Sequence, residues 1–291
     1  MKAGLIQHSN IEDTHKNLHY TLEKIDLLAQ QGAQLIVLQE LHSSLYFCQT
    51  ESQHHFDLAE SLDGNTASIL ATCAKKNKVV IIGSIFEKRS NGVYHNTAIV
   101  LDNDGSFAGH YRKMHIPDDP GYYEKYYFTP GDTGFTPIKT NIGTLGILIC
   151  WDQWFPESAR LMALAGAEIL IFPTAIGWDT NDTKEEKQRQ LDAWITIQRS
   201  HSIANNLPVI SVNRVGYEKD PSKQTDGIQF WGNSFACDAR GKIIAACSSE
   251  KNENVIIDID LTESDQQRLV WPYFRDRRID AYIDLTKRSI D

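Results

Sequence analysis

Apolar residues in the first half of the chain follow two patterns that take turns along the sequence: a helical spacing and short continuous runs. A spacing of four, three and four positions predicts one face of an amphipathic helix. The residues on that face are Leu18, Leu22, Ile25 and Ala29. A second helix is expected over 66–77. Short apolar runs bounded by polar or turn residues predict buried strands at 2–7, 34–40, 79–86, 96–102 and 106–113.

The second half of the chain continues this alternation. Helices are expected over 157–166 and within 184–206. Further strands are expected to end at Ile149 and to cover 168–173, 207–214, 233–238, 242–247 and 254–260. Because no Gly/Ser-rich linker divides the chain, the pattern predicts one α/β domain over 1–291. Residues from about 262 to 291 are expected to form a C-terminal extension that packs on the domain or on a partner.

Composition excludes some classes of function. The net charge is −9, from 29 Lys and Arg against 38 Asp and Glu, which argues against a protein that binds nucleic-acid backbones. The same charge permits a cationic ligand. The five cysteines are widely spaced and include no CxxC pair, so neither a disulfide framework nor a zinc site is expected. With no signal-peptide core and no apolar run long enough for a membrane span, the expected location is the cytoplasm.

Three ionisable residues occupy similar positions at the ends of predicted strands. Cys150 ends one strand and Glu40 ends another, while Lys113 ends a third just before a Pro, Gly and Tyr-rich loop over 114–137. Ligands of open α/β folds gather beyond the carboxyl ends of strands, and long loops in compact domains are usually functional. Each residue alone is compatible with an ordinary structural role: a buried thiol or a solvated charge.

Together these residues supply the parts of a cysteine nucleophile. Glu40 is the candidate base, Lys113 is the candidate cation for an oxyanion, and the N–H of Trp151 follows the thiol. The sequence has no GxSxG motif for a serine nucleophile, no Walker loop and no GxGxxG motif, so no nucleotide cofactor is expected.

The chain resembles the carbon-nitrogen hydrolase (nitrilase) superfamily, whose members carry a Glu-Lys-Cys triad. The matching motifs are LIVLQE with Glu40, YRKMHIP with Lys113, and LGILICWDQWFPE with Cys150. The resemblance implies a four-layer α-β-β-α sandwich, no cofactor or metal, and a homo-oligomer. It also assigns Glu124, in GYYEKYYF, to a second glutamate that the superfamily holds near its lysine.

Within the superfamily, several segments are most similar to the branch that hydrolyses N-carbamoylputrescine. They are YFCQ (46–49), CWDQWFPE (150–157), FPTAIGW (172–178) and FRDRRIDAY (274–282), while 41–45 departs from the acidic and glycine-containing pattern of that branch. The implied substrate is a small cationic ureido compound, attacked by Cys150 at its carbonyl carbon. Lys113→Ala is expected to be nearly inactive yet folded.

The far end of such a substrate calls for aromatic walls and an acidic group. The candidates near the triad are Tyr123, Trp151, Trp154, Trp178 and Asp179. Two alternatives remain open. A sister enzyme acting on N-carbamoyl amino acids or simple amides would use an arginine clamp, for which Arg199 and Arg214 are available. A non-catalytic binding member of the superfamily is the other alternative.

Overall fold

The computed structural model describes residues 1–220 and 222–290. Two six-stranded sheets form its centre. The strands of the first sheet are β1 (Lys2–Gln7), β2 (Leu35–Val37), β3 (Val80–Ser90), β4 (Val93–Leu101), β5 (Phe107–Arg112) and β15 (Glu253–Asp258). Those of the second are β6 (Ile138–Thr140), β7 (Gly143–Ile147), β8 (Ile169–Pro173), β10 (Val209–Val212), β13 (Phe235–Cys237) and β14 (Ile243–Ala246). Their spatial orders are β15, β1, β2, β3, β4, β5 and β14, β13, β10, β8, β7, β6.

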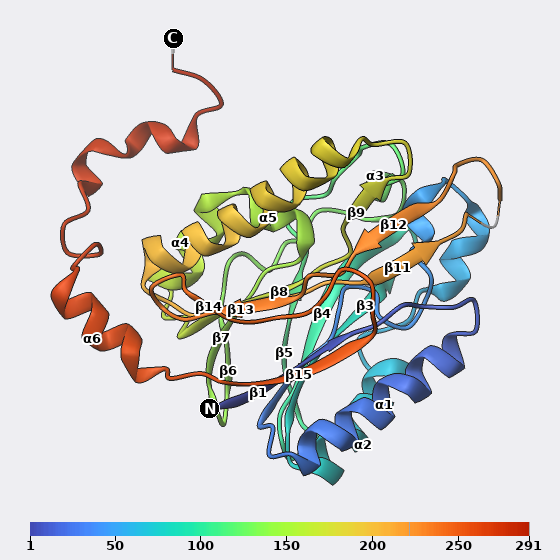
Figure 1. Ribbon diagram of the computed structural model, residues 1–291, viewed down its shortest axis with the longest axis horizontal. Helices are drawn as coiled ribbons and strands as arrows, with labels where there is room; N and C mark the ends of the chain where they lie inside the picture. Colours follow the sequence, from blue (N-terminus) through green and yellow to red (C-terminus); the bar gives the residue numbers. More distant parts are fainter. Residues whose placement is uncertain (221, 291) are drawn as a thin grey trace.

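Helices cover the outer face of each sheet. Helices α1 (Thr14–Gln30) and α2 (Asn65–Asn77) contact β1 and β3 of the first sheet. Helices α4 (Pro156–Leu164) and α5 (Lys184–Asn205) contact β7 and β10 of the second. Figure 1 shows the two sheets between these helix pairs. The four-layer α-β-β-α sandwich that the sequence resemblance implied is therefore confirmed.

The strands are apolar on both faces because helices cover one face of each sheet and the other sheet covers the opposite face. In β1, Leu5 belongs to the cluster between the sheets, whereas Ile6 belongs to the cluster beneath α1 and α2. In β3, Val80 points between the sheets and Ile81 points toward the helices. Successive strand residues face opposite sides, so a continuous apolar run buries both faces.

The structure contains elements that the sequence pattern did not predict. A third, smaller sheet has the order β11, β12, β9, with β9 at Gly177–Asp179, β11 at Val215–Glu218 and β12 at Ile228–Trp231. A four-residue helix, α3 (Glu124–Tyr127), lies inside the loop expected over 114–137. These elements have three or four residues each, which is too short for a period of two or 3.6 to be read.

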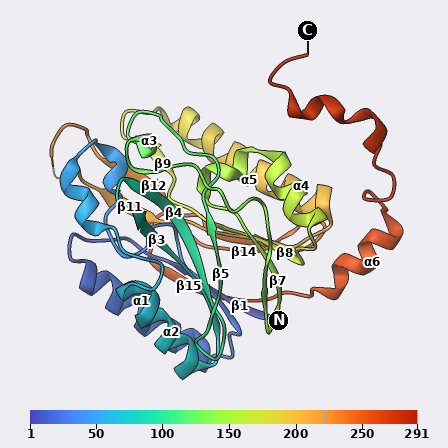
Figure 2. The same ribbon diagram turned by 180° about the vertical axis from the view of Figure 1, so that it is seen from behind.

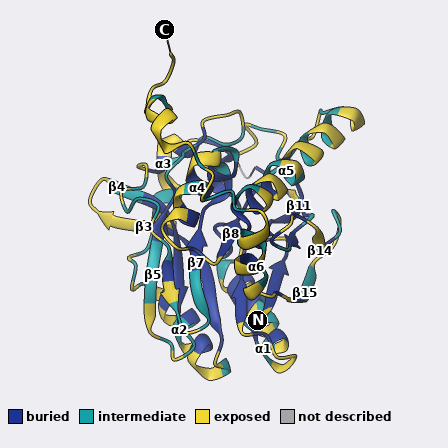
Figure 3. Ribbon diagram, turned by 90° about the vertical axis from the view of Figure 1, so that its left-hand side faces the viewer, coloured by how far each residue is buried: buried dark blue, intermediate teal, exposed yellow. Residues whose placement is uncertain are grey.

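The C-terminal segment lies along the outside of the sandwich. Helix α6 (Thr262–Val270) begins it, and Arg160 and Arg268 lie over the ring of Phe274 beyond that helix. The chain then extends away from the body, as Figures 1 and 2 show. Figure 3 colours most of this segment as exposed. Its exposed apolar residues include Leu269, Val270, Trp271, Ile279, Ile283 and Leu285. Among the described residues, none of the helices has the length and apolar character needed to cross a bilayer.

Candidate active site

Glu40 lies where the two sheets meet at their strand ends. Its chain leaves β2 after Val37, and its backbone N–H donates to the carbonyl of Thr174, just beyond β8, at 3.3 Å. The side chain is fully buried. Oε1 accepts hydrogen bonds from Asn96 Nδ2 and Lys113 Nζ, both at 2.7 Å. Oε2 has no hydrogen-bond partner in the described part of the chain, so one buried carboxylate oxygen is available to accept a proton.

Lys113 follows β5 directly, and both its backbone N–H and its backbone carbonyl form hydrogen bonds. Its N–H donates to the carbonyl of Asn96, and its carbonyl accepts from the N–H of Gly131. The fully buried ammonium lies 2.7 Å from Glu40 Oε1 and 2.9 and 2.7 Å from the two oxygens of Glu124. Burial opposes the charge, but the carboxylates of Glu124 and Glu40 outweigh it and raise the pKa of Lys113. Lys113 is therefore a permanent cation in this site.

Glu124 begins helix α3 and is also buried. Its Oε1 accepts a hydrogen bond from the phenol of Tyr46 at 2.7 Å. Burial raises the pKa of Glu124 to about 7, and the hydrogen bonds from Lys113 and Tyr46 limit that rise. Burial therefore makes Glu124 harder to ionise than an ordinary glutamate, although it remains in contact with the lysine.

Cys150 opens a short 3-10 helix (Cys150–Trp154) immediately after β7. Its backbone has φ of 42°, a left-handed conformation that is uncommon outside glycine, and its thiol lies 3.8 Å from the carbonyl oxygen of Ala175. Burial and the neighbouring Glu40 raise the pKa of the Cys150 thiol, and Lys113 acts in the opposite direction. The resting group is a thiol, so nucleophilic attack requires a base to remove its proton.

Asp152 connects the cysteine turn to the lysine strand. Its Oδ2 accepts from the N–H of Ile149 at 2.9 Å and from the phenol of Tyr111 at 2.8 Å. The backbone N–H of His115 and the ring Nδ1 of the same residue lie 3.0 and 2.7 Å from Oδ1. Tyr111 and His115 stand two positions before and two positions after Lys113. One buried carboxylate therefore fixes Lys113 and Cys150 relative to each other.

A cavity of about 510 Å³ opens above Cys150. Trp151, Trp154 and Asp179, three of the residues expected to bind substrate, line it. Further lining residues that the sequence did not single out are Tyr122, Trp231, Asp119, Asp182 and Arg189. The wall is thus aromatic near the thiol, and it carries three aspartates and one arginine.

The other two expected substrate contacts, Tyr123 and Trp178, are not among the residues that line this cavity. Trp178 packs against Trp231 with ring centroids 5.6 Å apart, and its indole N–H donates to the carbonyl of Lys187. The structure places Tyr122, not Tyr123, against the cavity, where its hydroxyl accepts a hydrogen bond from the N–H of Gly177 at 2.9 Å. Adjacent tyrosines in an aperiodic loop give no sequence signal for which of them faces inward.

Neither arginine considered as a substrate clamp lines the cavity. Arg199 is exposed on α5 and donates to the carbonyl of Gly241. Arg214 is fully buried and pairs with Glu218 at 2.7 Å. In the part of the chain that the structure describes, no group of three His, Cys, Asp or Glu side chains is placed to hold a metal ion.

Comparison with known proteins defines the class. The carbon-nitrogen hydrolase family model matches residues 2–268, so the chain belongs to that family and is an amidohydrolase. It is similar to the N-carbamoylputrescine amidase of Solanum lycopersicum, with 39% identity over 282 residues, 96% of this chain and 93% of the relative. It is also 38% identical to the citrullinase of Francisella tularensis subsp. tularensis over 289 residues, 99% of each chain.

A solved structure supports the same family. The crystal structure of a carbon-nitrogen hydrolase from Helicobacter pylori G27 superposes with a TM-score of 0.97 at 50% identity, covering 100% of this chain and 99% of that one. The family membership implied by the sequence motifs is therefore confirmed, and the chain is an N-carbamoylputrescine amidase-like protein of the nitrilase superfamily.

Proposed function

We propose that the protein hydrolyses N-carbamoylputrescine to putrescine, carbon dioxide and ammonia through a covalent intermediate on Cys150. The observation that carries this proposal is the cavity above the thiol, which combines aromatic walls with three aspartates. An ammonium group on a four-carbon chain matches such a wall, because aromatic faces and carboxylates both attract cations. The relatives named N-carbamoylputrescine amidase support the same substrate.

Glu40 acts as the general base. Its unpartnered Oε2 takes the proton of the Cys150 thiol while Sγ forms a bond to the ureido carbonyl carbon. The C=O π electrons move onto oxygen and form a tetrahedral oxyanion. As the oxyanion collapses, one C–N bond breaks and Glu40 returns the proton to the departing nitrogen. Water, deprotonated by Glu40, then cleaves the thioester-like intermediate and restores the thiol. If ammonia leaves first, the second step releases the carbamate of putrescine, which decomposes to carbon dioxide and putrescine. If putrescine leaves first, it releases carbamate, which decomposes to carbon dioxide and ammonia.

Lys113 and the backbone N–H of Trp151 stabilise the oxyanion. A ureido carbonyl is a weak electrophile because both nitrogens donate into it, so charge stabilisation on oxygen matters most for the rate. Loss of one such donor typically costs about 3 to 4 kcal/mol, roughly a hundred- to a thousandfold. Glu124 holds the ammonium of Lys113 between two carboxylates and so fixes its direction.

A second candidate substrate is citrulline, a ureido compound whose far end carries an ammonium and a carboxylate. Arg189 lines the cavity together with Asp179 and Asp182, so the wall presents one positive group beside its acids. The similarity to the Francisella citrullinase supports this alternative. Arg189 also pairs with Glu186, which competes for the guanidinium and favours the purely cationic substrate.

Steady-state kinetics test the proposal. Comparing kcat/KM for N-carbamoylputrescine, citrulline, N-carbamoyl-β-alanine and a short aliphatic amide separates the candidates, and a preference for any of the last three contradicts the main proposal. Mass spectrometry of enzyme quenched during turnover should detect an adduct on Cys150. The mass of the adduct identifies the product that leaves first.

We also propose that the protein forms a homo-oligomer in the cytoplasm. The exposed apolar residues of the C-terminal segment, such as Leu269 and Ile283 at 83% and 79%, are suited to burial against a second copy. The five cysteines are all free thiols in the structure, which suits a reducing compartment.

A further inference from the structure

Arg214 lies directly behind the turn that carries Glu40. It follows β10 and is fully buried. Its Nη2 donates to the backbone carbonyls of Glu40 and Leu41 at 3.0 and 2.9 Å. Its Nη1 donates to the carbonyl of Ser44 at 2.9 Å and to Glu218 Oε1 at 2.7 Å. One guanidinium therefore binds three carbonyls of a segment that lies 170 or more residues away in the sequence.

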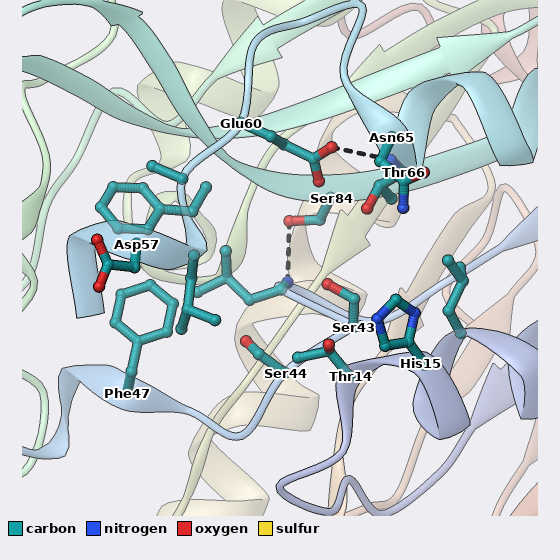
Figure 4. A pocket seen from close by; sticks show the side chains of 15 residues that line it. Thr14, His15, Ser43, Ser44, Phe47, Asp57, Glu60, Asn65, Thr66 and Ser84 are labelled. Carbon is teal, nitrogen blue, oxygen red and sulfur yellow. Dashed lines mark hydrogen bonds between the residues drawn. The ribbon is translucent and has the colours of Figure 1, made fainter. Parts of the chain in front are cut away.

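The turn needs this support because its backbone conformation is unfavourable. Leu41 has φ of 47°, in the left-handed region that a residue with a Cβ seldom adopts. Such conformations persist only where the surroundings fix them. The N–H of Leu41 donates to Ser84 Oγ at 2.9 Å, a bond drawn in Figure 4, and its carbonyl accepts from Arg214. Hydrogen bonds thus fix both sides of this residue.

Side-chain packing also supports the turn, because Leu41 is buried in a cluster with Tyr46 and Phe47. The same turn borders a second cavity, of about 240 Å³, which is lined by Leu41, Ser43, Ser44 and Ser84. Figure 4 labels the three serines. Hydrogen bonds fix the backbone of the Glu40 turn, and Arg214 makes three of them.

The partner of Arg214 extends this arrangement to the second carboxylate of the site. Glu218 Oε2 accepts a hydrogen bond from the backbone N–H of Tyr46 at 2.6 Å. The phenol of the same tyrosine donates to Glu124. Both glutamates that contact Lys113 are thus connected to the buried Arg214–Glu218 ion pair, Glu40 through its own carbonyl and Glu124 through Tyr46.

We propose that Arg214 is a positioning residue for catalysis, which with Glu218 holds the strained Glu40 turn so that the Glu40 carboxylate stays directed at Cys150. The proposal rests on the role of Glu40 as the base. It reassigns an arginine that the sequence offered as a clamp for an anionic substrate, since Arg214 donates to backbone carbonyls and does not line the substrate cavity.

Arg214→Lys tests the proposal, because one ammonium retains the charge but cannot reach three carbonyls and a carboxylate together. Misplacement of a catalytic group lowers the rate by about tenfold to a hundredfold. We expect a fall in kcat of that size for N-carbamoylputrescine, citrulline and a neutral amide alike, with KM changed by less than about twofold. The acid limb of the kcat/KM pH profile, which reports the catalytic base, should also shift, because a displaced Glu40 lies in different surroundings. Arg199→Lys, an exposed arginine on α5, is the matched control and should leave both constants unchanged.

Two further variants keep the test decisive if Arg214→Lys is poorly folded. Glu218→Gln retains the side-chain size and should lower kcat less than Arg214→Lys does. Guanidinium ion added to Arg214→Ala should restore activity in a saturable way, whereas methylammonium should not. An unchanged kcat and pH profile in Arg214→Lys, or a defect confined to KM for anionic substrates, overturns the proposal. Full activity of Glu40→Gln would instead overturn the proposed base, whatever Arg214 does.

Discussion

Lys113 Nζ and Glu124 Oε2 lie 2.7 Å apart, and both side chains are almost completely excluded from solvent. Glu40 contacts the same ammonium from another strand end. With both carboxylates ionised, the three groups carry a net charge of about −1, which suits a cationic substrate. Removal of the lysine charge would leave two buried carboxylates without a cation.

The pH dependence of stability should reveal the burial of Glu124. Its pKa is about 7 in the folded protein and 4.5 for the ordinary group, so the folded state retains a proton that the unfolded state loses between these values. Raising the pH through this window therefore lowers the free energy of unfolding, because the unfolded chain binds fewer protons. Glu124→Gln should flatten the decline between about pH 4.5 and 7 in urea titrations. Glu250→Gln, at an exposed position, should not.

Lys113→Ala should be destabilised as well as inactive. From the sequence alone we expected a folded and nearly inactive variant; the structure adds an expected loss of stability, because the ammonium is buried between two carboxylates. Removing one partner of a buried ion pair costs about 3 to 5 kcal/mol. The double variant Lys113→Ala/Glu124→Gln should recover part of that loss in denaturant titrations. If the loss in the free energy of unfolding for the double variant equals the sum of the losses for the two single variants, Lys113 and Glu124 do not stabilise each other.

Glu40→Gln should lose about 10²- to 10⁴-fold in kcat, the usual contribution of a general base. Its amide cannot take the thiol proton, so alkylation of Cys150 by iodoacetamide should also slow. Cys150→Ala should be inactive with any substrate and form no adduct. Retention of activity in Cys150→Ala would exclude covalent catalysis by this residue.

Asp179→Asn should raise KM for N-carbamoylputrescine by about ten- to a hundredfold, because a hydrogen bond to a charged group contributes about 1.5 to 3 kcal/mol. A neutral amide without the ammonium should show no such change. Arg189→Gln provides the opposite control, since it should affect citrulline and spare N-carbamoylputrescine. If Asp179→Asn raised KM equally for charged and neutral substrates, Asp179 would instead maintain the structure of the cavity wall and would not bind the ammonium.

The C-terminal segment should control the oligomeric state. Introducing charge through Ile283→Glu and Leu285→Glu, at positions exposed to 79% and 64%, should reduce the molar mass measured by light scattering. The activity per chain of the dissociated form then shows whether the site depends on assembly. Ile11→Glu, at a comparably apolar exposed position near the N-terminus, should leave the mass unchanged. A wild-type chain that is already monomeric at micromolar concentration would contradict the proposed oligomer.

The residues at the ends of continuous apolar runs could be located from the sequence, and their spatial neighbours could not. The run before Glu40 and the run before Cys150 are apolar on both faces, so the points where they leave the sheets were visible as changes in polarity. Asn96, which orients Glu40, lies 56 residues from it, and Asp152 beside Cys150 finds its partners Tyr111 and His115 41 and 37 residues away. Their partners depend on how the two sheets pack.

The same limit explains the errors in the cavity wall. The small third sheet and helix α3 are too short to show a period, yet they decide that Tyr122 faces the substrate cavity and Tyr123 does not. The role of Arg214 was hidden for a further reason. Its charge partner Glu218 is close in sequence, but its other partners are backbone carbonyls, which have no residue type that a sequence pattern can show.

In the third sheet, Ile228 of β12 stands opposite Glu218 of β11 on one side and opposite Asp179 of β9 on the other. A shift of β12 by one residue would turn every side chain of that strand to the other face. Such a shift would disturb the anchor of the Glu40 turn and the substrate wall in one event. Evolution toward other ureido substrates in this fold should therefore proceed by exchanging side chains around the cavity, and insertions or deletions within β12 should be excluded from active descendants.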